Sequence, residues 1–301
     1  APVPQGFDHV ELQENVDRDG DVIRVVTRSG GSNIRARGND FAQGDTVAPG
    51  IVLGAAHIGL LAAMNVDNVT VAARPRVAIL AGGDELVPPG TDPAEGQIIS
   101  SNDLAIAAMV RDAGGEPHIL PIARDTEDSL RASFCAAADA DLLVTIGGAS
   151  VGDHDLIGKM AQEHGIDQAF YKVALRPGKP LMAGRMAEGA MLGLPGNPVS
   201  AMVCAVLFMQ PLIRAMQGLP ADAPLRKARL AHDLPVEGPR QHYLRATLAA
   251  GEDLPLIAPF ADQDSARLAL MAQANALLVR PPHDPARPAG DLVDYIPLAA
   301  S

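Results

Sequence analysis

The strongest constraint on the fold is a change of pattern at Arg76. From there to about residue 220, short apolar runs that predict strands alternate with helical segments. This alternation is typical of βαβ units, and it predicts an α/β domain over residues 76–220 with a mostly parallel sheet. The expected strands are residues 76–80, 116–122, 141–146 and 191–194, and the expected helices are residues 102–113, 126–138, 155–163 and 198–216.

Both flanks of this domain predict smaller regions rich in β structure. Residues 1–44 carry short alternating segments at 9–13 and 22–26, and residues 45–75 add a helix at 54–64 and a strand at 68–72. After residue 220 the helical pattern stops, and residues 221–301 predict a small β domain. Its expected strands are residues 226–234, 241–249, 254–259, 276–279 and 292–298, with one helix at 266–273.

Composition excludes several classes of protein. The chain has 24 Lys and Arg against 36 Asp and Glu, a net charge of −12, and its aromatic residues are six Phe and three Tyr with no Trp. An acidic chain with so few stacking side chains predicts no nucleic-acid partner. Cys135 and Cys204 lie far apart outside any C-x-x-C, which excludes a disulfide scaffold and a cysteine zinc site and favours a reducing compartment.

No membrane partner is expected either. The most apolar stretch, residues 201–209, is shorter than the ~18–20 apolar residues that span a bilayer. No charged and then apolar leader opens the chain. The sequence therefore predicts a soluble, cytoplasmic protein.

The loops after the predicted strands should carry the chemistry, because ligands bind beyond the carboxyl ends of strands in an open parallel sheet. Loop 82–85 joins two glycines to Asp84 and Glu85, whose oxygens suit a hard cation such as Mg²⁺. Asp125, after the second strand, is a second candidate metal ligand with Glu85, or simply a helix N-cap.

Three further loops favour an anion. Small residues after the third strand, which include Gly147, Gly148 and Ser150, can form an amide nest for an anion, and Asp155 opens the next helix. Loop 172–180 carries three cations, Lys172, Arg176 and Lys179. A rigid strand-to-helix turn can direct backbone amides, and it contains Pro195, Gly196, Asn197, Pro198 and Ser200.

Taken singly, loop 82–85 and the turn 195–200 favour ordinary turns, Asp125 favours a helix N-cap, and the loop after the third strand is equally compatible with a capped helix start. The three cations of loop 172–180 favour an anionic ligand over a solvated face. In combination, carboxylates from three loops and cations from a fourth predict a phosphorylated substrate bound with Mg²⁺. The eight histidines show no H-x-x-x-H or H-E-x-x-H spacing, and no Ser-His-Asp order or nucleophile elbow is present. The residues thus indicate phosphate chemistry without identifying the substrate.

At these positions the sequence resembles the molybdopterin molybdotransferase family, which includes the E domain of gephyrin. The matching motifs are, in order, Val77-Ala78-Ile79 with Gly83-Asp84-Glu85-Leu86, Gly96-Gln97-Ile98 with Ser101-Asn102, Arg124-Asp125, Gly147-Gly148 with Ser150-Val151-Gly152-Asp153 and Asp155, Lys172-Val173-Ala174 with Pro177-Gly178-Lys179-Pro180, and Leu194-Pro195-Gly196-Asn197-Pro198-Val199-Ser200. The flanks resemble the family at residues 1–6, at Asn33-Ile34-Arg35 with Gly38 and Asp40, and at Arg245 and Ser265.

The resemblance implies a fold and an activity. The fold is a molybdopterin-binding-like three-layer domain, flanked by an incomplete N-terminal β-rich region and a small C-terminal β-barrel-like domain. The activity is insertion of molybdenum from molybdate into adenylated molybdopterin, with Mg²⁺ and release of AMP. The resemblance also implies a homodimer with the active site at the subunit interface, and a molybdopterin adenylyltransferase as a candidate partner.

The same resemblance assigns roles to residues. Glu85 and Asp125 would hold Mg²⁺ and organise the hydrolytic water, with Asp84 and Asp155 beside them. Lys172, Arg176 and Lys179 would attract molybdate and phosphate, and Asp40, Arg245 and Ser265 would line the same cleft.

The sequence departs from the family in three places. The usual Ser-Thr-Gly-Asp-Glu is here Ala81-Gly82-Gly83-Asp84-Glu85, a family lysine is Arg176, and a family chain carries a further segment before the point where this one begins. The alternative functions are an adenylyltransferase-like module and a non-catalytic dimeric scaffold.

Overall fold

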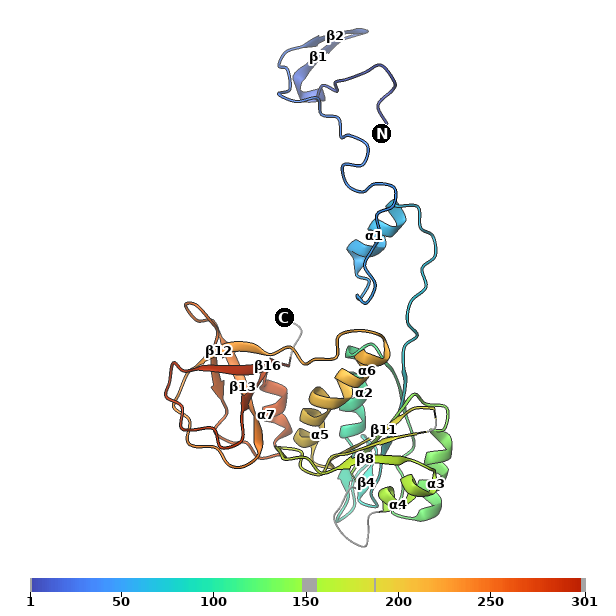
Figure 1. Cartoon of the computed structure of the whole chain (residues 1–301), viewed down its shortest axis with the longest axis vertical. Helices are drawn as coiled ribbons and strands as arrows, with labels where there is room; N and C mark the ends of the chain where they lie inside the picture. The colour runs from blue at the N-terminus through green and yellow to red at the C-terminus, as the bar shows by residue number, and fades with distance from the viewer. Residues whose placement is uncertain (1, 148–155, 187, 299–301) are drawn as a thin grey trace. The chain divides into compact units, whose positions relative to one another are not determined.

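The computed structural model describes residues 2–147, 156–186 and 188–298. The chain divides into two compact units, Ala1–Thr70 and Val71–Ser301 (Figure 1), and each is described by itself.

The first unit contains little regular structure. A 3-10 turn, η1 (Gln13–Asn15), leads into the antiparallel hairpin of β1 (Val16–Asp19) and β2 (Val22–Val25), and α1 (Ala55–Ala63) follows later. None of its described residues is buried. The hairpin and α1 confirm the expected strand at 22–26 and the helix at 54–64. The strands expected at 9–13 and 68–72 are wrong, because neither segment pairs with a neighbouring strand.

The second unit is built around a six-stranded mixed sheet. Its order is β6 (Glu116–Ile119), β3 (Arg76–Ala81), β7 (Leu142–Ile146), β11 (Ala190–Leu194), β10 (Met182–Arg185) and β8 (Asp167–Tyr171). The first four strands are parallel, which confirms the four predicted strands, and β10 and β8 continue the sheet antiparallel.

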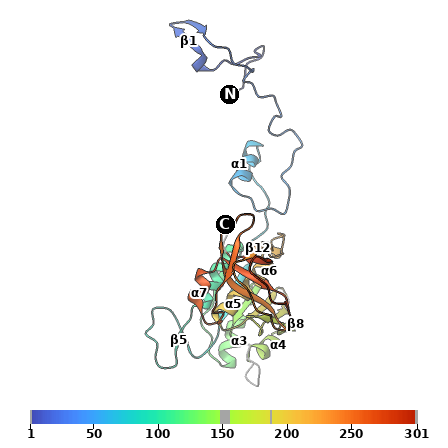
Figure 2. The same cartoon turned by 90° about the vertical axis from the view of Figure 1, so that its left-hand side faces the viewer.

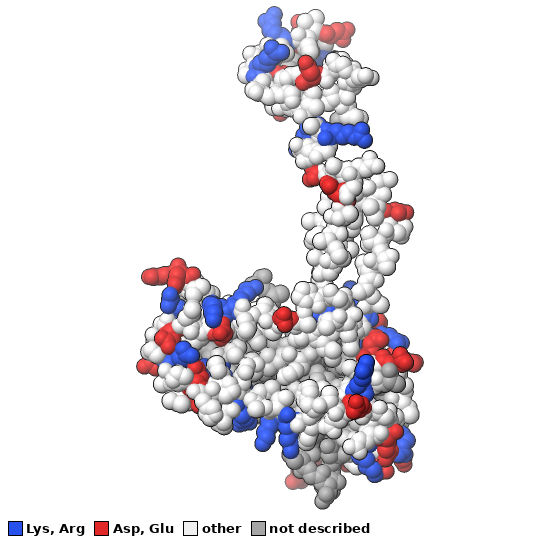
Figure 3. Space-filling view, in the orientation of Figure 1, with Lys and Arg blue, Asp and Glu red and all other residues white. Residues whose placement is uncertain are grey.

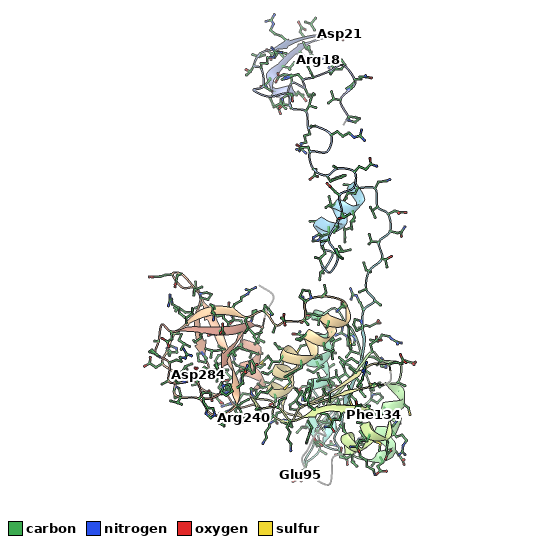
Figure 4. All side chains as sticks on the ribbon, viewed as in Figure 1. Arg18, Asp21, Glu95, Phe134, Arg240 and Asp284 are labelled. Carbon is green, nitrogen blue, oxygen red and sulfur yellow. The ribbon has the colours of Figure 1, made fainter. Side chains whose placement is uncertain are left out.

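Helices cover both faces of this sheet and produce three layers. Alternate residues of β3 show the two faces: Val77 and Ile79 belong to one buried cluster, and Ala78 and Leu80 belong to the other. The first cluster packs under α2 (Asn102–Asp112) and α5 (Pro198–Cys204). The second packs under α3 (Glu127–Ala136), which carries Phe134 (Figure 4), and α4 (Leu156–Glu163).

One long helix runs from α5 through a π-helical turn, η2 (Ala205–Met209), into α6 (Gln210–Met216). By length and composition this 19-residue helix could cross a membrane, with a mean hydropathy of 1.7, but half of its most apolar window is buried inside the protein. Its buried side chains reach two cores: Cys204 and Ile213 face the sheet, and Val199 and Val203 face the C-terminal strands. Figure 3 shows few charged side chains over this helix. These contacts are those of a core helix.

The C-terminal strands close into a barrel. They are β12 (Arg226–Leu230), β13 (Gln241–Ala249), β14 (Leu256–Pro259), β15 (Ala276–Arg280) and β16 (Leu292–Pro297), with α7 (Leu268–Gln273) between β14 and β15. The sheet order is β14-β12-β16-β15-β13, and pairing of β13 with β14 closes the ring. The expected β-barrel-like domain is therefore confirmed.

Three short strands, β4 (Leu86–Val87), β5 (Ile98–Ile99) and β9 (Leu175–Arg176), lie outside these sheets or join them. Strands β4 and β5 form a parallel pair at the base of an arm that projects from the α/β domain (Figure 2). Strand β9 follows β8 in the chain but pairs with β13 of the barrel. A loop of the α/β domain is thus attached to the C-terminal sheet.

Candidate active site

A cavity of about 630 Å³ lies beyond the carboxyl ends of β3, β7 and β11. Its walls come from five loops and from one residue of the C-terminal domain. The lining residues are Ala81, Gly82, Glu85, Leu86, Ile98, Ile99, Ser100, Ser101, Asn102, Ile146, Gly147, Pro180, Pro195, Gly196, Asn197, Pro198, Ser200 and Ala266. The predicted residues Glu85, Gly147 and the turn 195–200 therefore meet in one place, at the edge of the sheet where they were expected.

Hydrogen bonds tie the first two carboxylate loops together. The Gly83 amide donates to the carbonyl of Ala123 (3.1 Å), and the Asp125 amide donates to the carboxylate of Asp84 (3.3 Å). The Arg124 guanidinium also donates to the Asp84 carbonyl (3.1 Å). Asp84 and Asp125 are thus neighbours, although neither lines the cavity.

Asp125 is not the cap of the helix that follows it. Thr126 occupies that position, and its hydroxyl accepts a hydrogen bond from the Ser129 amide (3.3 Å). The simple structural alternative for Asp125 is therefore wrong, and its exposed carboxylate stays available to a ligand.

Gly83 makes room for the carboxylate of Glu85. Its φ is +148°, and a Cβ at this position would lie between 2.5 and 2.8 Å from three atoms of the Glu85 carboxyl group. A side chain here would displace the carboxylate of Glu85, which ends a flexible, exposed side chain, so the positive φ is the stronger reason for a glycine at this position.

These carboxylates suit a metal that arrives with its substrate. The described part of the chain holds no group of three or more His, Cys, Asp or Glu side chains that could bind a metal. Mg²⁺ is commonly held by one or two carboxylates together with substrate phosphates, and Glu85, Asp84 and Asp125 can supply that number. Three predicted residues, Gly148, Ser150 and Asp155, lie outside the described residues.

The turn 195–198 is held from two sides. The Asn102 side-chain amide at the start of α2 donates to the carbonyl of Gly196 (2.7 Å), and the Asn197 side-chain amide donates to the hydroxyl of Ser265 (3.1 Å). Pro198 has no amide hydrogen, and the Val199 amide already donates to the carbonyl of Ser265 (3.1 Å). The start of α5 is therefore less free to bind an anion than the sequence suggested.

The three predicted cations lie beside the cavity and not in its wall. Lys172, Arg176 and Lys179 are exposed, and their loop, residues 172–180, reaches the cavity only through Pro180. Lys172 lies over the ring of Tyr171, with its Nζ 4.9 Å from the ring centroid.

A buried histidine lies behind Arg176. His242 is the register partner of Arg176 in the pairing of β9 with β13, and its Nδ1 lies 2.9 Å from a carboxylate oxygen of Glu237. Burial lowers the pKa of His242, Arg176 and Arg280 lower it further, and Glu237 opposes the shift. No sequence motif connects Glu237 and His242 with Arg176, because only the pairing of β9 with β13 brings them together.

Arg245 does not line the cavity, contrary to expectation. Only 1% of it is exposed, and its guanidinium donates to the carbonyls of Asp262 (3.3 Å), Asp264 (2.9 Å) and Arg267 (3.0 Å). A buried guanidinium needs such partners, and the backbone of one loop supplies all three. Arg245 thus holds the loop that carries Ser265.

Asp40 lies in the first unit, where it lines a separate hollow with Arg35 and Arg37. Its expected place in the same cleft stays a prediction.

Sequence reasoning missed part of the cavity wall. Asn102 was noted as a helix start but not as a partner of the turn 195–198. Leu86 and Ile98 were named only within family motifs and not as site residues, and Ile99 was not singled out. The signal for Asn102 was a polar side chain at the beginning of a helix beside the predicted ligand edge.

Family models match most of the chain. The model described as MoeA N-terminal region (domain I and II) matches residues 1–65, the probable molybdopterin binding domain matches residues 78–215, and the MoeA C-terminal region (domain IV) matches residues 227–298.

Individual relatives agree with these matches. A molybdopterin molybdenumtransferase of Nostoc sp. is 34% identical over 93% of this chain and 66% of its own length, and molybdopterin molybdenumtransferase 2 of Mycobacterium tuberculosis is 35% identical over 92% and 70%. The crystal structure of a molybdopterin biosynthesis MoeA protein from Pyrococcus horikosii has a TM-score of 0.77 and 26% identity, covering 98% of this chain and 73% of that one. The chain thus spans about two thirds of the length of these curated relatives, and it belongs to the molybdopterin molybdenumtransferase family.

Proposed function

We propose that this protein inserts molybdenum from molybdate into adenylated molybdopterin and releases AMP, completing the molybdenum cofactor. One observation carries the proposal: Glu85, Gly147 and the turn 195–198 line a single cavity at the carboxyl edge of the sheet. Such a cavity suits a nucleotide-like substrate, because glycines allow a close approach of phosphate and polar side chains orient it.

The residues around the cavity have different roles in the proposed reaction. Glu85 contacts the substrate and orients water toward the phosphoanhydride, while Asp84 and Asp125 face the phosphate from the neighbouring loops. Lys172, Arg176 and Lys179 draw anions toward the entrance, where their charge compensates for the acidic chain. Arg176 in place of a lysine keeps this charge and offers a planar fork for an oxyanion.

Mg²⁺ would be held by Glu85 and Asp125 together with the substrate phosphates. The metal would supply charge neutralisation at the phosphoanhydride. The proposal also assigns to Asp155 the role of a further carboxylate at this site, as the family resemblance implies.

The proposal extends to assembly and location. We propose a homodimer that completes the active site at its interface, a molybdopterin adenylyltransferase as the partner that supplies the substrate, and a cytoplasmic location. The described cysteines, Cys135 and Cys204, are both free, which agrees with a reducing compartment.

The test is release of AMP from adenylated molybdopterin by the purified protein, with and without molybdate. We expect release to depend on molybdate, and Glu85→Ala to lower kcat/KM at least about a hundredfold, since the carboxylate acts at the reacting phosphate. Glu252→Ala is the matched control, because Glu252 is an exposed carboxylate in the barrel.

Each alternative function predicts a different outcome of this assay. Formation of adenylated molybdopterin from ATP would identify an adenylyltransferase. An intact, folded protein that performs neither reaction would identify a scaffold and end the proposal.

A further inference from the structure

Loop 262–267 of the C-terminal domain reaches across to the first turn of α5. It follows β14 and leads into α7, yet its Ser265 makes two contacts with the α/β domain. The Ser265 carbonyl accepts from the Val199 amide (3.1 Å), and its hydroxyl accepts from the side-chain amide of Asn197 (3.1 Å). One residue of the barrel therefore holds a turn that lines the proposed active site.

The loop is built to hold Ser265 in place. The carboxylate of Asp262 accepts from the Asp264 amide (2.9 Å) and from the Arg267 guanidinium (2.8 Å). The carboxylate of Asp264 accepts from the Ala266 amide (2.8 Å). These local hydrogen bonds turn the chain on either side of Ser265.

Gln263 attaches this loop to β13. Its Oε1 accepts from the Arg245 amide (3.0 Å), and its Nε2 donates to the carbonyls of Arg245 (3.0 Å) and Phe260 (2.8 Å). The side chain thus satisfies both backbone groups of Arg245, as a neighbouring strand would. Beneath it, the Arg245 guanidinium donates to three carbonyls of the same loop.

We infer that Gln263 is a positioning residue, which fixes loop 262–267 on β13 so that Ser265 holds Asn197 and Val199 in the geometry of the cavity wall. It does not line the cavity, and it acts only through Ser265. The effect on turnover rests on the proposed function, whereas the effect on the turn itself does not.

The kinetic test uses Gln263→Met, which keeps the length of the side chain and removes its three hydrogen bonds. Gln273→Met is the control, because the exposed Gln273 donates a comparable bond to the Ala269 carbonyl (3.1 Å) away from the cavity. We expect Gln263→Met to lower kcat/KM for AMP release by about five- to tenfold, with most of the change in kcat. The control should stay within about twofold of the parent.

A double-mutant cycle with Ser265→Ala shows whether the effect passes through Ser265. If it does, the double variant loses less kcat/KM than the product of the two single reductions, because Ser265→Ala has already removed the hydroxyl contact with Asn197 and leaves only the carbonyl contact with Val199 for Gln263 to hold. If the two reductions multiply, Gln263 acts by another route and the inference is wrong. The inference is equally wrong if Gln263→Met changes only the melting temperature.

Hydrogen exchange at the Val199 amide tests the same inference without turnover. Losing the Gln263 hydrogen bonds should weaken the bond from the Val199 amide to the Ser265 carbonyl. The Val199 amide should therefore exchange about tenfold faster in Gln263→Met, and its exchange rate should be unchanged in Gln273→Met. Unchanged exchange in both variants overturns the inference. If the parent protein releases no AMP, the proposed function fails, and this measurement still decides the role of Gln263.

Discussion

Replacing Gly178 by alanine should destabilise the protein through one identifiable contact. Gly178 has a φ of +112° and lies in loop 172–180, against the buried side of α5. A Cβ added there would overlap the Sγ of Cys204 and would lie 2.9 Å from a methyl group of Leu175. Cys204 is fully buried, so its sulfur has little space to move.

The expected cost is the sum of two effects. Overpacking a close-packed core costs about 1–3 kcal/mol, and a positive φ at a residue with a Cβ costs about 1–2 kcal/mol. The total of roughly 2–5 kcal/mol corresponds to a fall in melting temperature of about 5–15 °C for a unit of this size.

Thermal unfolding followed by circular dichroism measures this fall. The control is Gly165→Ala, since Gly165 has a φ of +69° and no atom within 4 Å of an added Cβ, so it shows the backbone effect alone. In a Cys204→Ala background, Gly178→Ala should cost less than in the parent protein and approach the cost of Gly165→Ala, because the overlapping sulfur is gone and only the Leu175 methyl contact remains. Equal costs for both glycines in the parent protein would refute the packing argument.

Two further predictions concern the charged groups of the C-terminal domain. Arg245→Met should lower the free energy of unfolding in urea by about 2–5 kcal/mol, because it removes the three hydrogen bonds that the buried guanidinium donates to the loop, even though the Asp264 and Arg267 carbonyls also accept from backbone amides. Arg226→Met on the exposed start of β12 should change it by less than about 0.5 kcal/mol. A loss below about 1 kcal/mol at Arg245 would contradict its role in holding the loop. His242 has a lowered pKa in the folded state, so the unfolded chain binds its proton first as the pH falls below about 6.5, and stability decreases from there through the lower folded pKa. His242→Gln should therefore flatten the pH dependence of the unfolding free energy between pH 7 and pH 5 by up to about 1 kcal/mol; an unchanged slope would show that His242 does not titrate differently on folding.

Much of the fold could be predicted because local patterns carry it. All four parallel strands of the α/β sheet were expected, and β13 was predicted at its observed bounds, Gln241–Ala249. Buried strands of a parallel sheet read as continuous apolar runs, and such runs are visible without knowing the neighbours. Strands β8 and β10 were missed because neither carries a continuous apolar run: β8 is the edge strand and is largely exposed, and β10 beside it is only partly buried.

The candidate site, too, could be predicted only in part from local patterns. The sequence by itself placed Glu85, Gly147 and the turn 195–198 at the ends of strands, and parallel strand order then brings such ends to one edge of the sheet. Which side chains touch was decided by tertiary structure. Asn102 meets the carbonyl of Gly196 across 94 positions of sequence, a separation that no local pattern can encode.

Arg245 shows most clearly what could not be predicted from the sequence. The family resemblance implied that Arg245 lines the cleft, but a guanidinium binds whichever acceptors surround it, and the folded barrel surrounds it with three backbone carbonyls. Local sequence determined which segments become strands, helices and turns, because propensity and periodicity act over neighbouring residues. The tertiary structure decided which polar groups find one another, because burial forces each of them to take the partner that packing provides.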